Sequence, residues 1–303
     1  MMVKLAFISF YLSCSLLPAH EDPNDVLHVL SHKLEHAKIA DKPELYFQRA
    51  IEYRASGQKE KAKADLLRYT ELEPTDHLGW LELGRVEAEA KNRLIYLTKS
   101  LDLANSDEAK SMSYYELAAH FYGTQNYQMA LKKCESAIRL DKQKKLTPML
   151  LKSHLLWQLR GLDERVDFLT VAKKKNPSIV LQNSWIDAMI DAGKVLEVKK
   201  MIDKEIQTSR FRSSWYIRAA LCEPKHSDQA KEKAQLAISE IKERLNEKRP
   251  DVTLLMDLAL AYVIIEKNDG AAQYLTRAKL MNHDPWAMVE LEQKIKATVI
   301  KPN

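Results

Sequence analysis

Glycine is scarce in this chain, with 7 residues among 303, whereas an average usage of about 7% would supply roughly 21. Phosphate-binding loops and tight hairpins depend on glycine because it adopts their backbone conformations without steric cost. Sequence motifs of common enzymes are also absent, since there is no GxGxxG, HExxH, CxxC or Gly-x-Ser-x-Gly and no phosphate loop ending in Gly-Lys-Ser/Thr. The sequence therefore predicts a protein that is not an enzyme and that takes no cofactor.

Strong charge of one sign is lacking as well. The formal net charge is +5, although 29% of the residues are charged. The densest basic stretches (142–145, 173–175 and 199–200) fall at expected helix ends or flanks, where lysine complements the helix dipole. We expect these stretches to be solvated, and we expect no nucleic-acid partner.

The residues that are abundant favour helices. Ala, Leu, Lys and Glu dominate the sequence, and 46% of the residues are apolar. These four residue types enter helices at the smallest free-energy cost. The composition therefore indicates a helical protein with a substantial core.

The first twenty residues differ from the rest. A single early cation, Lys4, is followed by an uncharged run over 5–17, then by Pro18 and the acidic residue Glu21. A run of this length is too short for a spanning helix of about 20 residues. We therefore predict a signal peptide over 1–20, export to the periplasm or the exterior, and no membrane span. Lipid anchoring through Cys14 is a less favoured alternative, because Tyr11 stands where a bacterial lipoprotein signal usually has Leu.

A period of 34 residues runs through the chain after that segment. Aromatic residues recur at Tyr46, Trp80 and Tyr114, and small residues recur four positions later, at Ala50, Gly84 and Ala118. Each unit contains two apolar stripes at helical spacing, and the first is separated from the second by the breaker pair Ser56 and Gly57. Each unit is therefore a helical hairpin, and its small residues let the two helices approach each other closely. Such hairpins must stack to bury their faces, which produces a superhelix with a concave side.

The segments HLGWLELGRVEAEA (77–90) and SYYELAAHFYGTQNYQMALKKCESAIRLD (113–141) resemble the tetratricopeptide repeat family. The resemblance implies an all-α fold, a right-handed superhelical solenoid of stacked helical hairpins. We expect about seven units over 42–284, a capping helix over 21–41, and a C-terminal capping helix and tail over 285–303. The fourth unit departs from the pattern at Arg165, and the sixth departs from it near Pro224. Cys134 and Cys222 lie in units that are not neighbours, so we expect no disulfide between them.

Three histidines, His28, His32 and His36, follow one another at intervals of four in the expected first helix. This spacing places them on one face, within reach of a shared metal ion. A functional site normally requires a third and a fourth ligand in fixed orientation, and no cysteine is near. A polar helix flank is the favoured interpretation, and the three residues remain weak candidates for a metal site.

The register of the repeat also predicts which residues line the concave groove. These are one or more residues on the first helix of each of the first four units: Phe47, Arg54, Leu81, Arg85, Tyr115, Tyr122, Leu150, His154 and Trp157. Exposed aromatic and Arg side chains are typical of interaction hot spots. We therefore expect a protein or peptide partner that docks through apolar and aromatic contacts.

Other functions remain open at this point. The family's two-carboxylate clamp for chaperone tails is disfavoured, because Phe47, Ile51, Glu82 and Glu116 occupy the corresponding places. The favoured hypothesis is an exported bacterial scaffold without catalysis of its own. The alternatives are a periplasmic carrier of a small molecule or metal ion, and an accessory subunit of an enzyme complex.

Overall fold

The computed structural model describes residues 23–247 and 250–281 together with Trp286, Met288, Val289, Leu291, Glu292 and Ile295. The predicted signal peptide lies outside the described residues. Within them the chain forms fifteen α-helices and one short 3-10 helix, and no strand. The predicted all-α class is confirmed. None of the helices in this part of the chain combines the length and apolarity that crossing a bilayer requires.

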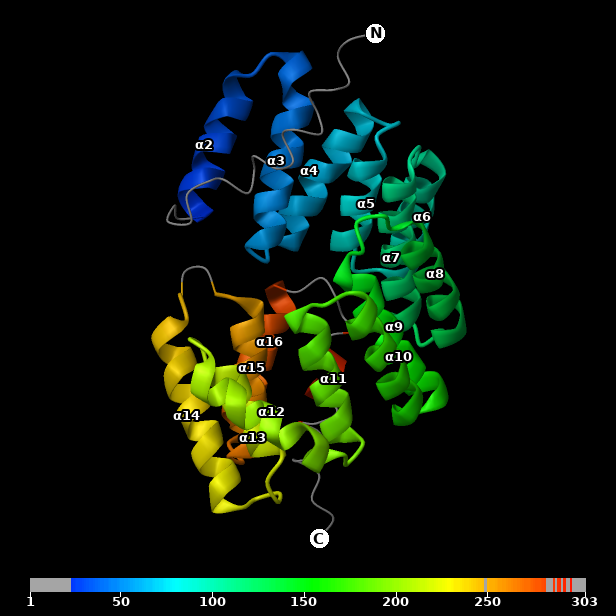
Figure 1. The fold of residues 1–303 in the computed structure, drawn as a ribbon. Coiled ribbons are helices and arrows are strands. Elements are labelled where there is room, and N and C mark those ends of the chain that lie inside the picture. Colours follow the sequence, from blue (N-terminus) through cyan, green and yellow to red (C-terminus); the bar gives the residue numbers. More distant parts are fainter. Residues whose placement is uncertain are drawn as a thin grey trace.

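The helices pack as seven consecutive hairpins (Figure 1). The chain enters through α2 (Pro23–His36) and η2 (Ile39–Asp41). The hairpins are α3 (Lys42–Ala55) with α4 (Lys59–Leu72), α5 (His77–Val86) with α6 (Ala90–Leu103), α7 (Asp107–Gly123) with α8 (Tyr127–Leu140), α9 (Leu146–Arg160) with α10 (Leu162–Lys175), α11 (Ile179–Asp191) with α12 (Val195–Thr208), α13 (Ser213–Leu221) with α14 (Asp228–Arg244), and α15 (Val252–Ile264) with α16 (Asn268–Met281). The second helix of each hairpin also packs on the first helix of the next, so the units form a continuous solenoid.

Short polar side chains fix where many of these helices begin. The carboxylate of Asp76 accepts a hydrogen bond from the backbone N–H of Leu78, and the hydroxyl of Ser106 accepts one from Ala109. Such caps satisfy backbone donors that have no partner within the first helical turn. Gly57, with φ of +76°, makes the turn after α3, a conformation that side-chain-bearing residues rarely adopt.

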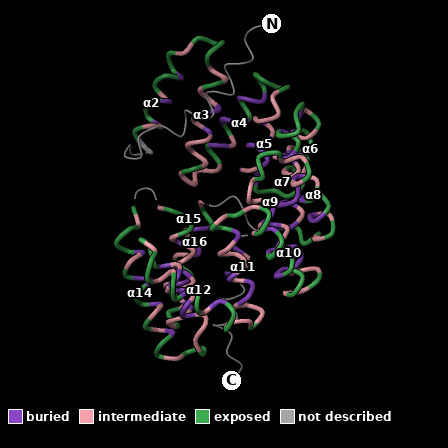
Figure 2. Tube along the Cα trace, in the orientation of Figure 1, coloured by how far each residue is buried: buried purple, intermediate pink, exposed green. Residues whose placement is uncertain are grey.

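Small residues at the repeat positions bring the paired helices together. Ala50 and Ala118 are fully buried. A Cβ atom added to Gly84 would lie 2.5 Å from Cδ2 of Leu97, so α5 and α6 touch through this glycine. Buried positions recur along the hairpins in Figure 2, as expected when each unit packs mainly against its neighbours.

The solenoid curves until its two ends meet. In Figure 1 the chain passes from α3 and α4 in the upper half through α9 and α10 to the lower half, where α15 and α16 bring it back toward the turn of the first hairpin. A Cβ atom added to Gly57, in the first hairpin, would lie 3.4 Å from the backbone oxygen of Leu280, in the last. The helices therefore enclose a central space, which we call the lumen.

The described residues between 286 and 295 are helical, and we call them the C-terminal segment. One side of this segment packs on the last hairpin, where Met288, Leu291 and Ile295 join the core of α15 and α16. The other side meets the middle of the solenoid, where Trp286 joins the core of α7, α8 and α9. The C-terminal segment thus lies between two parts of the array that are distant in sequence.

Candidate binding site in the lumen

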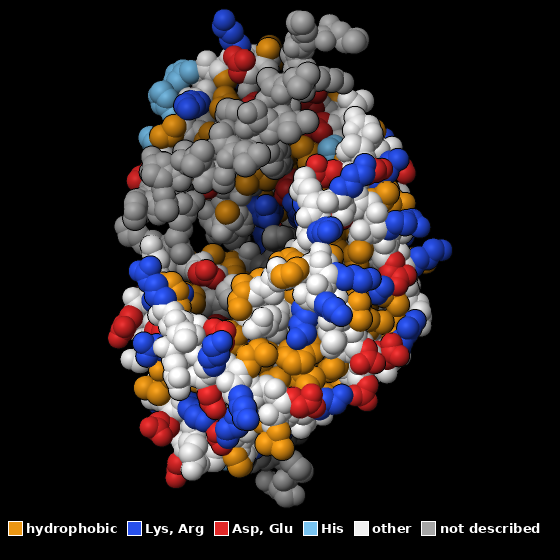
Figure 3. All heavy atoms as spheres, in the orientation of Figure 1, with side chains coloured by type: hydrophobic (Ala, Val, Ile, Leu, Met, Phe, Trp, Pro, Cys, Tyr) orange, Lys and Arg blue, Asp and Glu red, His pale blue; other side chains and the backbone are white. Residues whose placement is uncertain are grey.

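Two cavities flank the C-terminal segment. One, which we call the basic cavity, has a volume of about 240 Å³ and is lined by Lys59, Arg85, Arg93, His120, Lys279 and Glu292 among others. The other, which we call the acidic cavity, has a volume of about 230 Å³ and includes His154, Arg165, Asp187, Asp191, Arg218 and Asp257 in its lining. Figure 3 shows the molecule hollowed near its centre, with Lys or Arg side chains inside the hollow.

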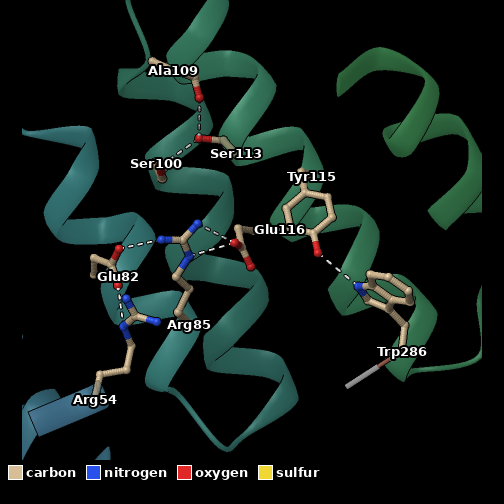
Figure 4. Close-up of polar contacts among 9 residues, drawn as sticks. All are labelled: Arg54, Glu82, Arg85, Ser100, Ala109, Ser113, Tyr115, Glu116 and Trp286. Carbon is tan, nitrogen blue, oxygen red and sulfur yellow. Dashed lines mark hydrogen bonds and ion pairs between the residues drawn. The ribbon is translucent and has the colours of Figure 1, made fainter. Parts of the chain in front are cut away.

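A chain of ion pairs connects the first three hairpins beside the basic cavity (Figure 4). Arg85 on α5 contacts Glu82 at 2.6 Å and Glu116 on α7 at 2.7 Å. Glu82 also pairs with Arg54 on α3 at 3.0 Å. Burial alone would lower the pKa of Arg85, but the charges of Glu116 and Glu82 outweigh it and raise that pKa. The network therefore neutralises two buried carboxylates and ties three hairpins together.

Trp286 closes the aromatic part of the lumen. Its indole Nε1–H donates a 3.0 Å hydrogen bond to the hydroxyl of Tyr115, as Figure 4 shows. Its ring centroid lies 5.1 Å from that of His154 on α9. Only 5% of Trp286 is exposed. The aromatic surface predicted on α7 is thus covered by the chain's own C-terminal segment.

The acidic cavity holds one carboxylate without an ion-pair partner. Asp187 on α11 receives two hydrogen bonds from Arg218 on α13, at 2.8 and 2.9 Å, and Arg165 lies 3.5 Å from Asp191. No such partner is found for Asp257 within the described residues. Burial and the neighbouring carboxylates raise its pKa to about 6, against an opposing effect of Arg218. A cationic group of a ligand would stabilise the charged form of Asp257.

The predicted groove residues fall into two groups in the structure. Five keep some exposure. Arg85 lines the basic cavity, and Leu150 and His154 line the acidic cavity. Arg54 pairs with Glu82, and the ring of Trp157 lies 5.4 Å from the guanidinium of Arg165. The other four, namely Phe47, Leu81, Tyr115 and Tyr122, are buried.

These four positions require a correction, because they do not face an open groove. Phe47 stacks on Tyr69 with ring centroids 4.9 Å apart, and Leu81 is fully buried in a core with Leu97 and Leu117. Tyr115 and Tyr122 belong to the core that Trp286 completes. Side chains of the same hairpin, of the next hairpin or of the C-terminal segment cover these four positions.

Several lumen residues were missed at the sequence level. Lys59 and Arg93 are 34 residues apart, but Lys59 is the first residue of α4 and Arg93 is the fourth of α6, so the period alone does not place them together. His120 and Asp257 are not indicated either. Trp286 was placed in a closing helix, and nothing in the local sequence indicates what its ring contacts.

The three histidines lie on α2, and all are exposed. The ring centroids of His32 and His36 are 4.8 Å apart. Over the described ranges, no group of three or more His, Cys, Asp or Glu side chains is arranged to hold a metal ion.

Comparisons with known proteins bear on the fold. No family model matches this sequence, and no curated protein matches it. Among solved structures, a tetratricopeptide repeat protein from Parabacteroides merdae is similar over 84% of this chain and 99% of its own, with 14% identity and a TM-score of 0.50. Yeast Tom70 is similar over 91% of this chain, with 16% identity and a TM-score of 0.55, and the match spans 58% of Tom70.

The chain has the tetratricopeptide repeat fold. The seven hairpins of this tetratricopeptide solenoid and the continuous packing between them agree with that assignment. Its lumen differs from the open groove that we predicted, because the C-terminal segment divides it into a basic and an acidic cavity.

Proposed function

We propose that this protein is an exported, non-catalytic scaffold that binds a segment of a partner protein in the acidic cavity of its lumen. The observation that carries the proposal is Asp257, a carboxylate without an ion pair in the described structure, set among apolar side chains that include Leu221, Met256 and Leu260. The partner segment would present a basic side chain to Asp257 and apolar side chains to its surroundings. Extended concave surfaces of solenoids are suited to such segments.

The charge of the cavity supports a cationic group in the ligand. Its three aspartates exceed its two arginines by one, and both arginines already contact Asp187 or Asp191. An ion pair with a desolvated carboxylate is stronger than one formed in water. A lysine or arginine side chain of the partner would therefore form its strongest ion pair in this cavity with Asp257.

Site-specific photo-crosslinking tests this function. A photo-reactive residue replacing Met256, in the acidic cavity, is expected to give a discrete adduct with a partner protein in the source cells. The matched position is Leu196, which is 88% exposed on α12 and lies outside both cavities. Asp257→Asn should reduce the adduct at Met256 about tenfold, since a hydrogen bond to a charged group contributes about 1.5–3 kcal/mol.

The pH dependence of the adduct provides a second readout. Asp257, with its pKa raised to about 6, is charged at pH 7.5 and protonated at pH 5. The yield should fall over this range in the parent protein and stay level in Asp257→Asn. Identical adducts from Met256 and Leu196, or equal yields from the parent protein and the Asp257→Asn variant, would rule out binding in this cavity.

Export is tested separately. Residues 1–20 fused to mature alkaline phosphatase should give active enzyme in a bacterial host, because that enzyme forms its disulfides only outside the cytoplasm. Lys4→Glu together with Leu12→Arg should abolish that activity by removing the cation and interrupting the apolar run. Full activity in the variant, or none with the parent sequence, would exclude export through this segment.

A further inference from the structure

Two cations without ion-pair partners face the basic cavity. Lys59 is the first residue of α4 and Arg93 lies in the first turn of α6, and both line the cavity. No carboxylate in the described part of the chain lies within ion-pairing distance of either. The other cations of the cavity are matched, Arg85 by Glu116 and Lys279 by Glu292 at 2.7 Å each. The lining of the cavity therefore has four cations, Lys59, Arg85, Arg93 and Lys279, against two carboxylates, Glu116 and Glu292.

Arg93 is held in position by the backbone. Its Nε and Nη2 atoms donate to the backbone oxygen of Glu87, at 2.9 and 2.5 Å. An arginine side chain has five N–H donors, so Nη1 remains able to donate to a ligand. Because the guanidinium is already oriented, a ligand loses little further side-chain entropy on binding there.

A buried histidine adds a third polar group. His120 on α7 lines the same cavity, is 5% exposed, and its Nδ1 has no hydrogen-bond partner in the described structure. Burial, together with the charge of Arg93, lowers its pKa. The neutral ring can donate one N–H to a ligand. A buried polar atom without a partner is uncommon in proteins and often marks a functional position.

The cations around Lys59 repel it. Burial lowers the pKa of Lys59, and the positive charges of Arg93 and Arg54 lower it further. Like charges brought together destabilise one another's charged forms, an effect that the charges of Glu87 and Glu116 offset only in part at Arg93. An anion between Lys59 and Arg93 would remove this repulsion.

We propose that the basic cavity binds a compact dianion of the phosphate class, either inorganic phosphate or a small phosphomonoester, between Lys59, Arg93 and His120. The excess of two cations over carboxylates in the lining matches a dianion. The volume of about 240 Å³ lies below the roughly 300–1,000 Å³ typical of sites for larger organic ligands. The C-terminal segment contributes Met288 and Glu292 to the lining of the cavity. This site is independent of the partner-binding function proposed for the acidic cavity.

Calorimetric titration of the purified protein tests the site. Inorganic phosphate, sulfate and glycerol phosphate are the probes, at constant ionic strength set with chloride. Saturable binding of at least one probe is expected, and Lys59→Met or Arg93→Met should weaken it about tenfold or more, since each removes a charged donor. The matched controls are Lys61→Met and Lys91→Met, which remove exposed cations from the same two helices.

Thermal unfolding without any added anion separates binding from a structural role. Lys59→Met should raise Tm, by roughly 2 °C, because it removes a repulsive charge while methionine keeps a similar helix propensity. If Lys59 only supported the fold, its replacement would lower Tm. The proposal is overturned if none of the three anions binds, if both cavity variants bind as the parent does, or if the Lys61 and Lys91 controls lose binding equally. Should Arg93→Met fail to fold, Lys59→Met alone decides.

Discussion

Replacing Arg85 with methionine is expected to destabilise the protein by about 3–5 kcal/mol, the range for removing one partner of a buried charge network. Arg85 contacts Glu82 and Glu116, both of which are buried. Glu82 keeps Arg54 as a partner in the variant, whereas Glu116 loses its contact with Arg85 and remains inside the protein. Urea unfolding followed by circular dichroism at pH 7 measures the loss.

Two further variants identify the cause. Arg85→Met combined with Glu116→Leu should recover most of the lost stability, because replacing a whole buried pair with apolar residues is often neutral. Arg68→Met removes an equally charged residue whose partner, Glu71, is exposed, and it should change stability by less than about 1 kcal/mol. If Arg85→Met costs no more than Arg68→Met, the network contributes little to the fold.

The sequence was sufficient to predict the hairpins, because their determinants are local. The apolar stripe of Tyr46, Ala50 and Tyr53 is followed by a second stripe, and together they specify two short helices. Gly57 specifies the turn between them. Ala50, Gly84 and Ala118 share one register, and all three sit where paired helices touch. The unusual Arg165 of the fourth unit is also explained, because it is buried beside Asp191 and over Trp157.

The lumen could not be predicted in the same way, because its determinants are distant in sequence. Whether Tyr115 is exposed depends on Trp286, which is 171 residues away. Small rotations between successive hairpins add up over seven units, and no single residue specifies their sum. The meeting of Gly57 with Leu280, and the cavities that result, follow from that sum.

Removing the ring of Trp286 is the second change for which we expect a large effect. Trp286→Ala should cost about 3 kcal/mol or more, since truncation of a buried aromatic residue leaves a cavity that the surroundings fill only in part. It also removes the hydrogen bond to Tyr115 and the ring contact with His154. Urea unfolding measures the cost. Met288, Leu291 and Ile295 should still hold the C-terminal segment on α15 and α16.

Conservative variants separate the ring from its hydrogen bond. Trp286→Phe keeps most of the apolar area and should cost about 1–2 kcal/mol. Tyr115→Phe removes the acceptor hydroxyl alone. Because both changes remove the same bond, the double variant should cost less than the sum of the two single variants.

The overall dimensions of the Trp286→Ala variant show which role Trp286 has. It either holds the middle of the solenoid to its end, as a brace, or only covers the last hairpin, as a cap. If Trp286 holds the middle of the solenoid to its end, its loss should widen the lumen and raise the radius of gyration in small-angle X-ray scattering. A cap would leave the radius unchanged, because its contacts with α15 and α16 are retained. Loss of stability without a change in radius would therefore identify Trp286 as a cap.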